Sequence, residues 1–205
     1  MTIAEKLVNI AERVPIVYEA GRKSEYDRFW DIVQKNGIKC NYNYAFCGAI
    51  WVDDIYNPKY DIVCTGAVNM FRQAEITDSK VTVDIRGANG TYMFFDCTKL
   101  RKIRKIIVNE NNLFTGCFQN NVNLEEIRFE GTIGNSLDLH WSTKLSAESY
   151  YSIITALSSS VSGQKFIVPP TAEATYNANP PQGDDIPQTW AELIGKKNNW
   201  SIAES

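Results

Sequence analysis

Few residues of this chain have the types and spacing that catalysis requires. The sequence holds a single histidine, His140, in the segment Leu139-His140-Trp141. Histidine-based triads and multi-histidine metal sites are therefore excluded or reduced to one ligand, and a structural hydrogen bond is the favoured role for His140. The sequence contains no G-x-G-x-x-G, P-loop or G-x-S-x-G motif. We therefore expect no catalytic residues, no metal site and no cofactor.

The cysteines do not show the number or spacing of a disulfide framework or a zinc site. Their number is odd and no C-x-x-C pair occurs, so neither a disulfide set nor a structural zinc site is expected. We interpret them as small buried hydrophobes rather than reactive thiols. They are Cys40, Cys47, Cys64, Cys97 and Cys117.

Two groups of residues are weak candidates for ligand binding. Trp51, Tyr56 and Tyr60 lie in an irregular, loop-like stretch. They suit either packing, which we favour, or an exposed platform for a partner or glycan, because aromatic rings bind with little loss of entropy. Arg101 and Arg104 belong to a basic run that suits an anion site or, as we favour, a solvated face.

An internal repeat indicates which elements position these residues. The phenylalanines Phe46, Phe71, Phe94 and Phe118 follow one another at intervals of 25, 23 and 24 residues in similar local contexts. A fixed period of this length is typical of stacked repeat architectures, in which each unit buries its hydrophobic side chains against its neighbours. We therefore predict that the four rings form an aromatic stack inside the molecule.

The strongest match joins two consecutive units. The segment Met93–Ile103 aligns with Cys117–Ile127 at an offset of 24, and both contain Leu-x-x-Ile. The second unit continues to Phe129, which gives the L-x-x-L-x-L strand signature of leucine-rich repeats. The same offset places the cations Arg101 and Lys102 opposite the acids Glu125 and Glu126 on adjacent parallel strands. Opposite charges at such positions stabilise strand pairing.

The flanking segments differ from the repeats. We divide the chain into N-terminal helices over residues 1–36, a repeat region over 37–140 and a C-terminal cap over 141–205. The first segment has apolar residues at the a and d positions of a heptad pattern, which we call the a/d seam. These residues could pack on the rest of the chain or form a short coiled coil between subunits. Its residues are Ile3, Leu7, Ile10, Val14 and Val17.

The C-terminal segment predicts an αβαβ cap. We expect a helix over residues 146–158 that begins at Ser146, a strand over 164–168, and a loop over 176–187 that is rich in Asn, Pro and Gly. A last helix over 187–197 and a strand over 200–202 follow. Solenoids need such atypical terminal units because their end faces would otherwise expose the core.

Taken together, these repeats resemble the BspA-like (Treponema pallidum-type) leucine-rich repeats of bacterial surface proteins. The flanking stretches, such as Tyr18–Trp30, Asn57–Val63 and Gly131–Gly134, resemble phage and prophage proteins of gut Firmicutes. The resemblance implies an α/β fold, a short leucine-rich-repeat solenoid with an N-terminal helical segment and the C-terminal cap. It implies protein or glycan binding at a virion or cell surface and supplies no catalytic residues. The few and irregular repeats, with residues 76–85 fitting only loosely, depart from the family pattern.

Composition narrows the classes of function. The chain has 205 residues, 44% of them hydrophobic, and a formal net charge of −3, which is typical of a globular protein and gives no reason to expect nucleic acid. The sequence shows no signal peptide and no apolar run of membrane-spanning length. We expect a non-enzymatic binding module on a phage virion or bacterial surface, with homo-oligomerisation through residues 1–36 as an option. The alternatives are a glycan-processing hydrolase and a cytoplasmic protein-interaction scaffold.

Overall fold

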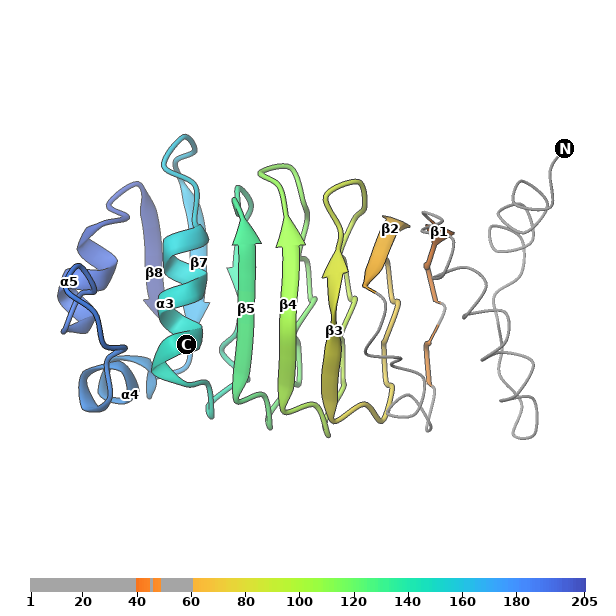
Figure 1. The fold of residues 1–205 in the computed structure, drawn as a ribbon, viewed down its shortest axis with the longest axis horizontal. Coiled ribbons are helices and arrows are strands. Elements are labelled where there is room, and N and C mark those ends of the chain that lie inside the picture. Colours follow the sequence, from red (N-terminus) through yellow and green to blue (C-terminus); the bar gives the residue numbers. More distant parts are fainter. Residues whose placement is uncertain (1–39, 45, 49–60) are drawn as a thin grey trace, which may run out of the picture.

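The computed structural model describes residues 40–44, 46–48 and 61–205, which form an α/β structure with two parallel sheets (Figure 1). In the first sheet, the strands lie side by side in the order in which they occur along the chain. This confirms the predicted α/β class. The strands are β1 (Cys40–Asn41), β2 (Ile62–Gly66), β3 (Asp78–Asp84), β4 (Lys102–Val108) and β5 (Glu126–Gly131).

The second sheet and the helices follow the first sheet along the chain. The sheet has the order β6-β7-β8 and is parallel throughout. Its strands are β6 (Leu137–Asp138), β7 (Gln164–Val168) and β8 (Trp200–Glu204). The helices are α3 (Ala147–Ala156), α4 (Ala172–Ala178) and α5 (Trp190–Gly195). The buried side chains of both sheets belong to one hydrophobic cluster.

Alternation along the strands separates an inner from an outer side of the first sheet. On β4, the side chains of Ile103, Ile106 and Val108 are buried, whereas Arg104 is exposed. On β5, Ile127 is buried in the same way. Strands with one buried face show this alternation because successive side chains point to opposite faces. The aliphatic residues of the Leu-x-x-Ile motifs therefore lie inside, as predicted.

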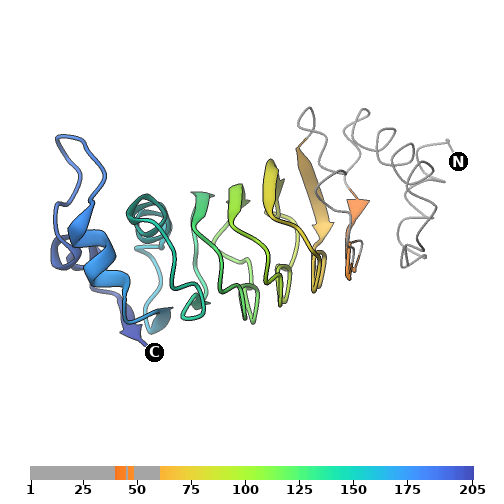
Figure 2. The ribbon, with the colours of Figure 1, turned by 90° about the horizontal axis from the view of Figure 1, so that it is seen from below.

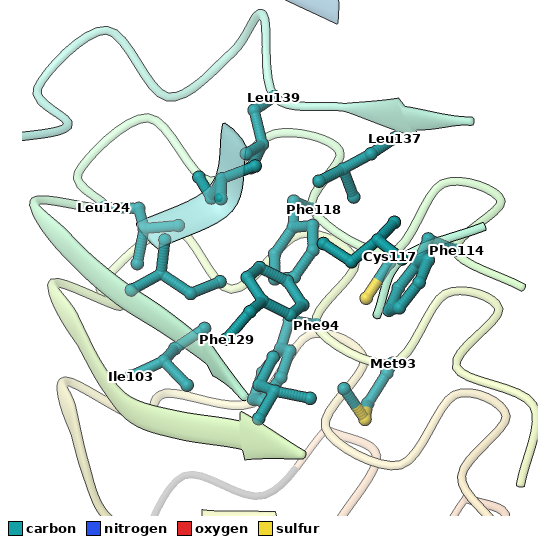
Figure 3. Close-up of a cluster of buried hydrophobic side chains, with 14 of the residues drawn as sticks. Met93, Phe94, Ile103, Phe114, Cys117, Phe118, Leu124, Phe129, Leu137 and Leu139 are labelled. Atoms are coloured by element: carbon teal, nitrogen blue, oxygen red, sulfur yellow. The ribbon is translucent and has the colours of Figure 1, made fainter. Parts of the chain in front are cut away.

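The predicted aromatic stack is present. The rings of Phe46 and Phe71 lie 4.8 Å apart and nearly parallel, and those of Phe71 and Phe94 lie 5.1 Å apart. Phe118 continues the stack at 6.0 Å from Phe94, and Phe129 of β5 meets Phe118 edge to face at 6.4 Å. Figure 3 shows these last rings packed together at the centre of the buried cluster. Both geometries are favourable for aromatic pairs.

Hydrogen bonds also join the return segments that connect the strands. The amide N of Phe71 donates to the carbonyl of Met93 at 2.7 Å, and that of Phe94 donates to Cys117 at 3.0 Å. Figure 2 shows these return segments stacked on the side of the molecule that lies opposite the strands of the first sheet. Each unit thus satisfies backbone groups of its neighbour on both sides of the core, as buried backbone requires.

Equivalent turns carry a row of polar side chains. Gln73, Asp96 and Asn120 have positive φ angles of 58°, 59° and 62°. Their side chains join, because Nε2 of Gln73 lies 3.4 Å from Oδ2 of Asp96 and Nδ2 of Asn120 donates to Oδ1 of Asp96. Asp and Asn tolerate the left-handed conformation better than other non-glycine residues. At two of the three equivalent positions, the residue type therefore favours the backbone conformation that the turn requires.

Helix α3 takes the place of a further strand beside β5 (Figure 2). The hydroxyl of Ser149 accepts a hydrogen bond from the amide N of Ile127, and that of Ser152 accepts one from Phe129. These amides belong to the edge of the sheet. An unpaired edge is prone to pairing with another chain, and covering it with a helix removes that hazard.

The C-terminal predictions are largely confirmed. Ser146 caps α3 by accepting from the amide N of Ser149 at 3.3 Å, and β7 has the predicted bounds. The last helix is shorter than predicted, since α5 begins directly after its N-cap Thr189, which forms a capping box with Glu192 in the first turn, and ends at Gly195. The prediction of a loop from residue 176 was wrong at its start, because α4 continues to Ala178. The cap therefore has an additional short helix.

Residues 1–36 lie outside the described residues, and so do the a/d seam and the predicted helices. The divisions after residues 36 and 140 stay predictions. Residues 76–85, which fit the repeat only loosely in sequence, include β3, which pairs with both β2 and β4. None of the described helices has the length and apolar character needed to cross a bilayer.

Candidate binding face

The outward side chains of β4 and β5 form the best-defined exposed surface over the strands, which we call the strand face. Its members are at least partly exposed, and most are charged. They stand on a rigid scaffold, because the opposite side of each strand is packed into the core. The members are Lys102, Arg104, Lys105, Ile107, Glu126, Arg128 and Glu130.

Ion pairs cross between the two strands. Nζ of Lys102 lies 2.6 Å from Oε1 of Glu126, and Nζ of Lys105 lies 2.6 Å from Oε2 of Glu130. Just before the strands, the guanidinium of Arg101 contacts both carboxylate oxygens of Glu125, at 3.0 and 2.9 Å. The predicted opposition of Arg101 to Glu125 and of Lys102 to Glu126 is therefore confirmed.

The ion pairs shift the ionisation of their members in the expected directions. The hydrogen bond to Glu125 raises the pKa of Arg101, and the hydrogen bond to Glu126 raises the pKa of Lys102. The hydrogen bond from Arg101 in turn lowers the pKa of Glu125. These hydrogen bonds thus favour the charged states of Arg101, Lys102 and Glu125, although exposed pairs contribute little to folding.

A bulge brings two basic side chains to adjacent positions on this face. Ile103 pairs with Ile127 and Ile106 with Phe129, so two residues of β4 stand opposite the single residue Arg128. These two residues are Arg104 and Lys105, and Lys105 reaches Glu130. The register therefore sets Arg104 and Lys105 together opposite Arg128, and both arginines are exposed.

The strand face is basic although the chain is acidic. It carries the four cations Lys102, Arg104, Lys105 and Arg128 against the two carboxylates of Glu126 and Glu130, a net charge of +2, whereas the whole chain has −3. Bulges often lie beside functional sites, where they redirect side chains. Chemically, two neighbouring guanidinium groups suit carboxylate, sulfate or phosphate groups of a partner.

The sequence-predicted binding residues have different outcomes. Arg101 lies at the start of this region and is engaged with Glu125, and Arg104 is a central member of the strand face. Trp51, Tyr56 and Tyr60 lie outside the described residues. Arg128 was not among the predicted residues, although its offset of 24 from Arg104 was the signal that could have identified it.

Other chemically capable side chains have structural partners. Nδ1 of His140 lies 2.6 Å from Oδ1 of Asp138, and the imidazole ring lies 4.7 Å from the Trp141 ring. The single histidine thus makes the hydrogen bond expected of a structural role. In the part of the chain that the structure describes, no three His, Cys, Asp or Glu residues form a group suited to a metal ion.

The thiols are mainly core side chains. Cys64, Cys97 and Cys117 are buried, as predicted. Burial raises the pKa of Cys97 to about 12 and also raises that of Cys117, which opposes thiolate formation and hence reactivity. The prediction was wrong for Cys47, which is exposed, because it follows the buried Phe46 in a turn. The side chain of Cys40 lies outside the described residues.

The strand face therefore combines a rigid scaffold, paired charges and three basic side chains at the bulge, Arg104, Lys105 and Arg128. Its residues derive from two neighbouring repeat units, so their placement depends on the 24-residue period. Comparisons of this chain with protein-family models, with curated proteins and with solved structures find no match.

Proposed function

We propose that this protein is a non-enzymatic binding module that recognises an acidic protein surface or an acidic glycan through the strand face. In this proposal, the repeat units form a short leucine-rich-repeat solenoid that holds the face rigid. The stacked phenylalanines and the hydrogen bonds between return segments support the solenoid interpretation. Rigid scaffolds with extended faces suit such recognition, because little entropy is lost on binding.

The observation that carries the proposal is the bulge in β4, which places Arg104 and Lys105 together opposite Arg128 on β5. A partner carboxylate or sulfate that binds to these basic side chains gains charge-assisted hydrogen bonds, which a guanidinium group can make in bidentate form. The neighbouring lysines lie against glutamates of the same face. This arrangement favours binding of an anion over proton transfer, since arginine stays protonated at all ordinary pH values.

The resemblance of the repeats to BspA-like proteins supports a setting on a phage virion or a bacterial cell surface. Association through the a/d seam of residues 1–36 is part of the same proposal. Light scattering on the full chain tests it. A dimer or trimer that becomes a monomer in the variant Leu7→Asp, Ile10→Asp supports an assembly role, whereas a monomer in both contradicts it.

Binding of defined polyanions tests the strand face. The probes are a polyglutamate peptide, polygalacturonate as an acidic glycan, and dextran as an uncharged control. We expect saturable binding of at least one polyanion, none of dextran, and weaker binding at high salt, because salt screens exposed charges. The charge reversal Arg104→Glu, Arg128→Glu should abolish binding.

The matched control is Lys165→Glu, which reverses an exposed charge on β7 of the second sheet. It should bind like the parent chain. Equal loss in the control, or no binding of either polyanion, contradicts the proposal. Release of reducing ends from polygalacturonate would instead favour a glycan-processing hydrolase.

A further inference from the structure

A second polar site lies at the carboxyl ends of β4 and β5, where the first sheet gives way to α3. A cavity of about 550 Å³ opens there, within the size range of small-ligand sites. Its walls are formed by residues 108–110 at the end of β4, residues 131–132 at the end of β5, residues 155–160 around the end of α3, and Lys197. The cavity begins where the strand face ends and shares none of its residues.

The backbone of β5 directs one more amide group to this place. The amides of Ile127 and Phe129 point to α3, and the alternation of a strand directs that of Gly131 to the same side. The next hydroxyl in the series on α3 belongs to Thr155, which donates to the carbonyl of Tyr151 at 2.7 Å. Among the described residues, no α3 hydroxyl accepts a hydrogen bond from Gly131, so the series of hydroxyls that serve β5 ends at Ser152.

Two charged side chains of opposite sign line the same cavity. The hydroxyl of Ser158 donates to Oε1 of Glu110, and Oε2 has no hydrogen-bonding partner among the described residues. The ammonium of Lys197 donates to the carbonyl of Leu157 at the end of α3. Since an ammonium group has three hydrogens, Lys197 retains donors for a ligand. Partial burial lowers its pKa.

The wall that carries Ser158 is held in place from behind. Its carbonyl accepts from Nδ2 of Asn199 and from Nε1 of Trp200, both at 2.8 Å. Asn199 also donates to the carbonyl of Val161 at 2.6 Å, and the amide N of Ser158 donates to Ile133 at 2.8 Å. A site fixed in this way loses little freedom when a ligand binds.

We propose that this cavity binds a neutral sugar unit. An anion would face the carboxylate of Glu110, and a cation would face the ammonium of Lys197. A sugar hydroxyl donates and accepts at once, so neighbouring hydroxyls can donate to Glu110 while accepting from Lys197. The threonine and serine hydroxyls of the wall, including Thr132, add groups of both kinds. This proposal does not rest on the strand face.

Amide chemical shifts of the full chain test the proposal. The probes are the methyl glycosides of glucose, galactose, mannose and N-acetylglucosamine, with inorganic phosphate as the anionic comparison. We expect saturable shifts at Gly131, Thr132 and Ser158–Ser160 with at least one sugar and none with phosphate. In Glu110→Gln, Oε1 can still accept from Ser158 while the free acceptor becomes a donor, so the affinity should fall about tenfold or more.

The matched control is Glu148→Gln, which makes the same change at an exposed position of α3 and should leave sugar binding unaltered. The chain with Arg104→Glu, Arg128→Glu should also retain it, which separates this site from the strand face. The proposal is overturned if none of the sugars produces saturable shifts at these amides, if phosphate binds there instead, or if Glu110→Gln binds as the parent does.

Discussion

Ser149 of α3 accepts, through Oγ, a hydrogen bond of 3.0 Å from the amide N of Ile127 on β5. One turn further along the helix, Ser152 accepts from Phe129 at the same distance. A helix thus serves the backbone of a sheet edge that would otherwise need another strand. This relationship explains how a row of parallel strands ends without leaving the edge of β5 open. The cavity lies just beyond Ser152, the last α3 serine whose hydroxyl accepts from an amide of β5.

Replacing Ser149 with alanine should destabilise the protein by about 1–3 kcal/mol, because the buried amide of Ile127 loses its acceptor and no water replaces it. The free energy of unfolding, measured by urea denaturation, checks this. Ser162→Ala removes an exposed hydroxyl and should change stability by no more than about 0.5 kcal/mol. Equal stability of the two variants would show that the Ser149 hydroxyl does not support the sheet edge.

The repeating part of the fold was predictable from the sequence because its physical cause repeats. Each stacked unit needs a large ring in the same place, so Phe71, Phe94 and Phe118 recur at intervals of 23 and 24 residues. The offset of 24 then gave the pairing of Lys102 with Glu126 without further information. The two serines of α3 were not predictable in this role, because a side chain that binds a backbone amide of another element leaves no periodic pattern.

The candidate sites were less predictable than the fold. Arg104 was identified from its basic neighbours, but its position beside Arg128 depends on a bulge, which inserts one residue that no sequence pattern marks. The cavity joins Glu110, Ser158 and Lys197, which are far apart in the chain and belong to different elements. Such a set becomes visible only when the chain is folded.

Replacing Phe94 with a smaller side chain should greatly lower the free energy of unfolding. The Phe94 ring stacks on both Phe71 and Phe118 and is fully buried. Phe94→Ala should cost about 3–5 kcal/mol of unfolding free energy. Phe94→Leu should cost less, since leucine fills more of the space. Thermal or urea denaturation measures both. Val122→Ala, at an exposed position, is the control, and a loss there as large as in Phe94→Ala would contradict the argument.

Gly116→Ala should destabilise the protein less when the side chain of Tyr92 is replaced by a smaller one. Gly116 has a φ of +58°, and a Cβ there would lie 2.3 Å from Cε1 of Tyr92. The left-handed conformation alone costs an alanine about 1–2 kcal/mol. The collision adds to this, since the Tyr92 ring must leave its edge contact with Phe95.

A double-mutant cycle separates the two costs at Gly116. The loss of stability caused by Gly116→Ala should be smaller in the Tyr92→Ala background than in the parent chain, by about 0.5 kcal/mol or more. Urea denaturation of the four proteins gives this difference. Strict additivity would mean that the ring moves aside without cost and that only the backbone conformation disfavours alanine.

Alkaline pH should destabilise the fold through the buried thiols. Burial raises the pKa of Cys97 to about 12, whereas an unfolded cysteine has a pKa of about 8.5. Between these values the folded state holds a proton that the unfolded state releases. The free energy of unfolding should therefore be level with respect to this group below about pH 8.5 and fall as the pH rises, by up to about 1.4 kcal/mol per pH unit for each such thiol.

Urea denaturation at a series of pH values from about 8 to about 10.5, a window inside these pKa limits, measures the slope. Cys117 and Tyr150, whose pKa values burial also raises, act in the same direction. Cys97→Ala should lower stability at every pH but reduce the slope, because the alanine side chain has no proton to lose. Cys47→Ala, at an exposed position, should reduce the slope less. An unchanged slope in Cys97→Ala would mean that its thiol ionises as readily in the folded chain as in the unfolded one.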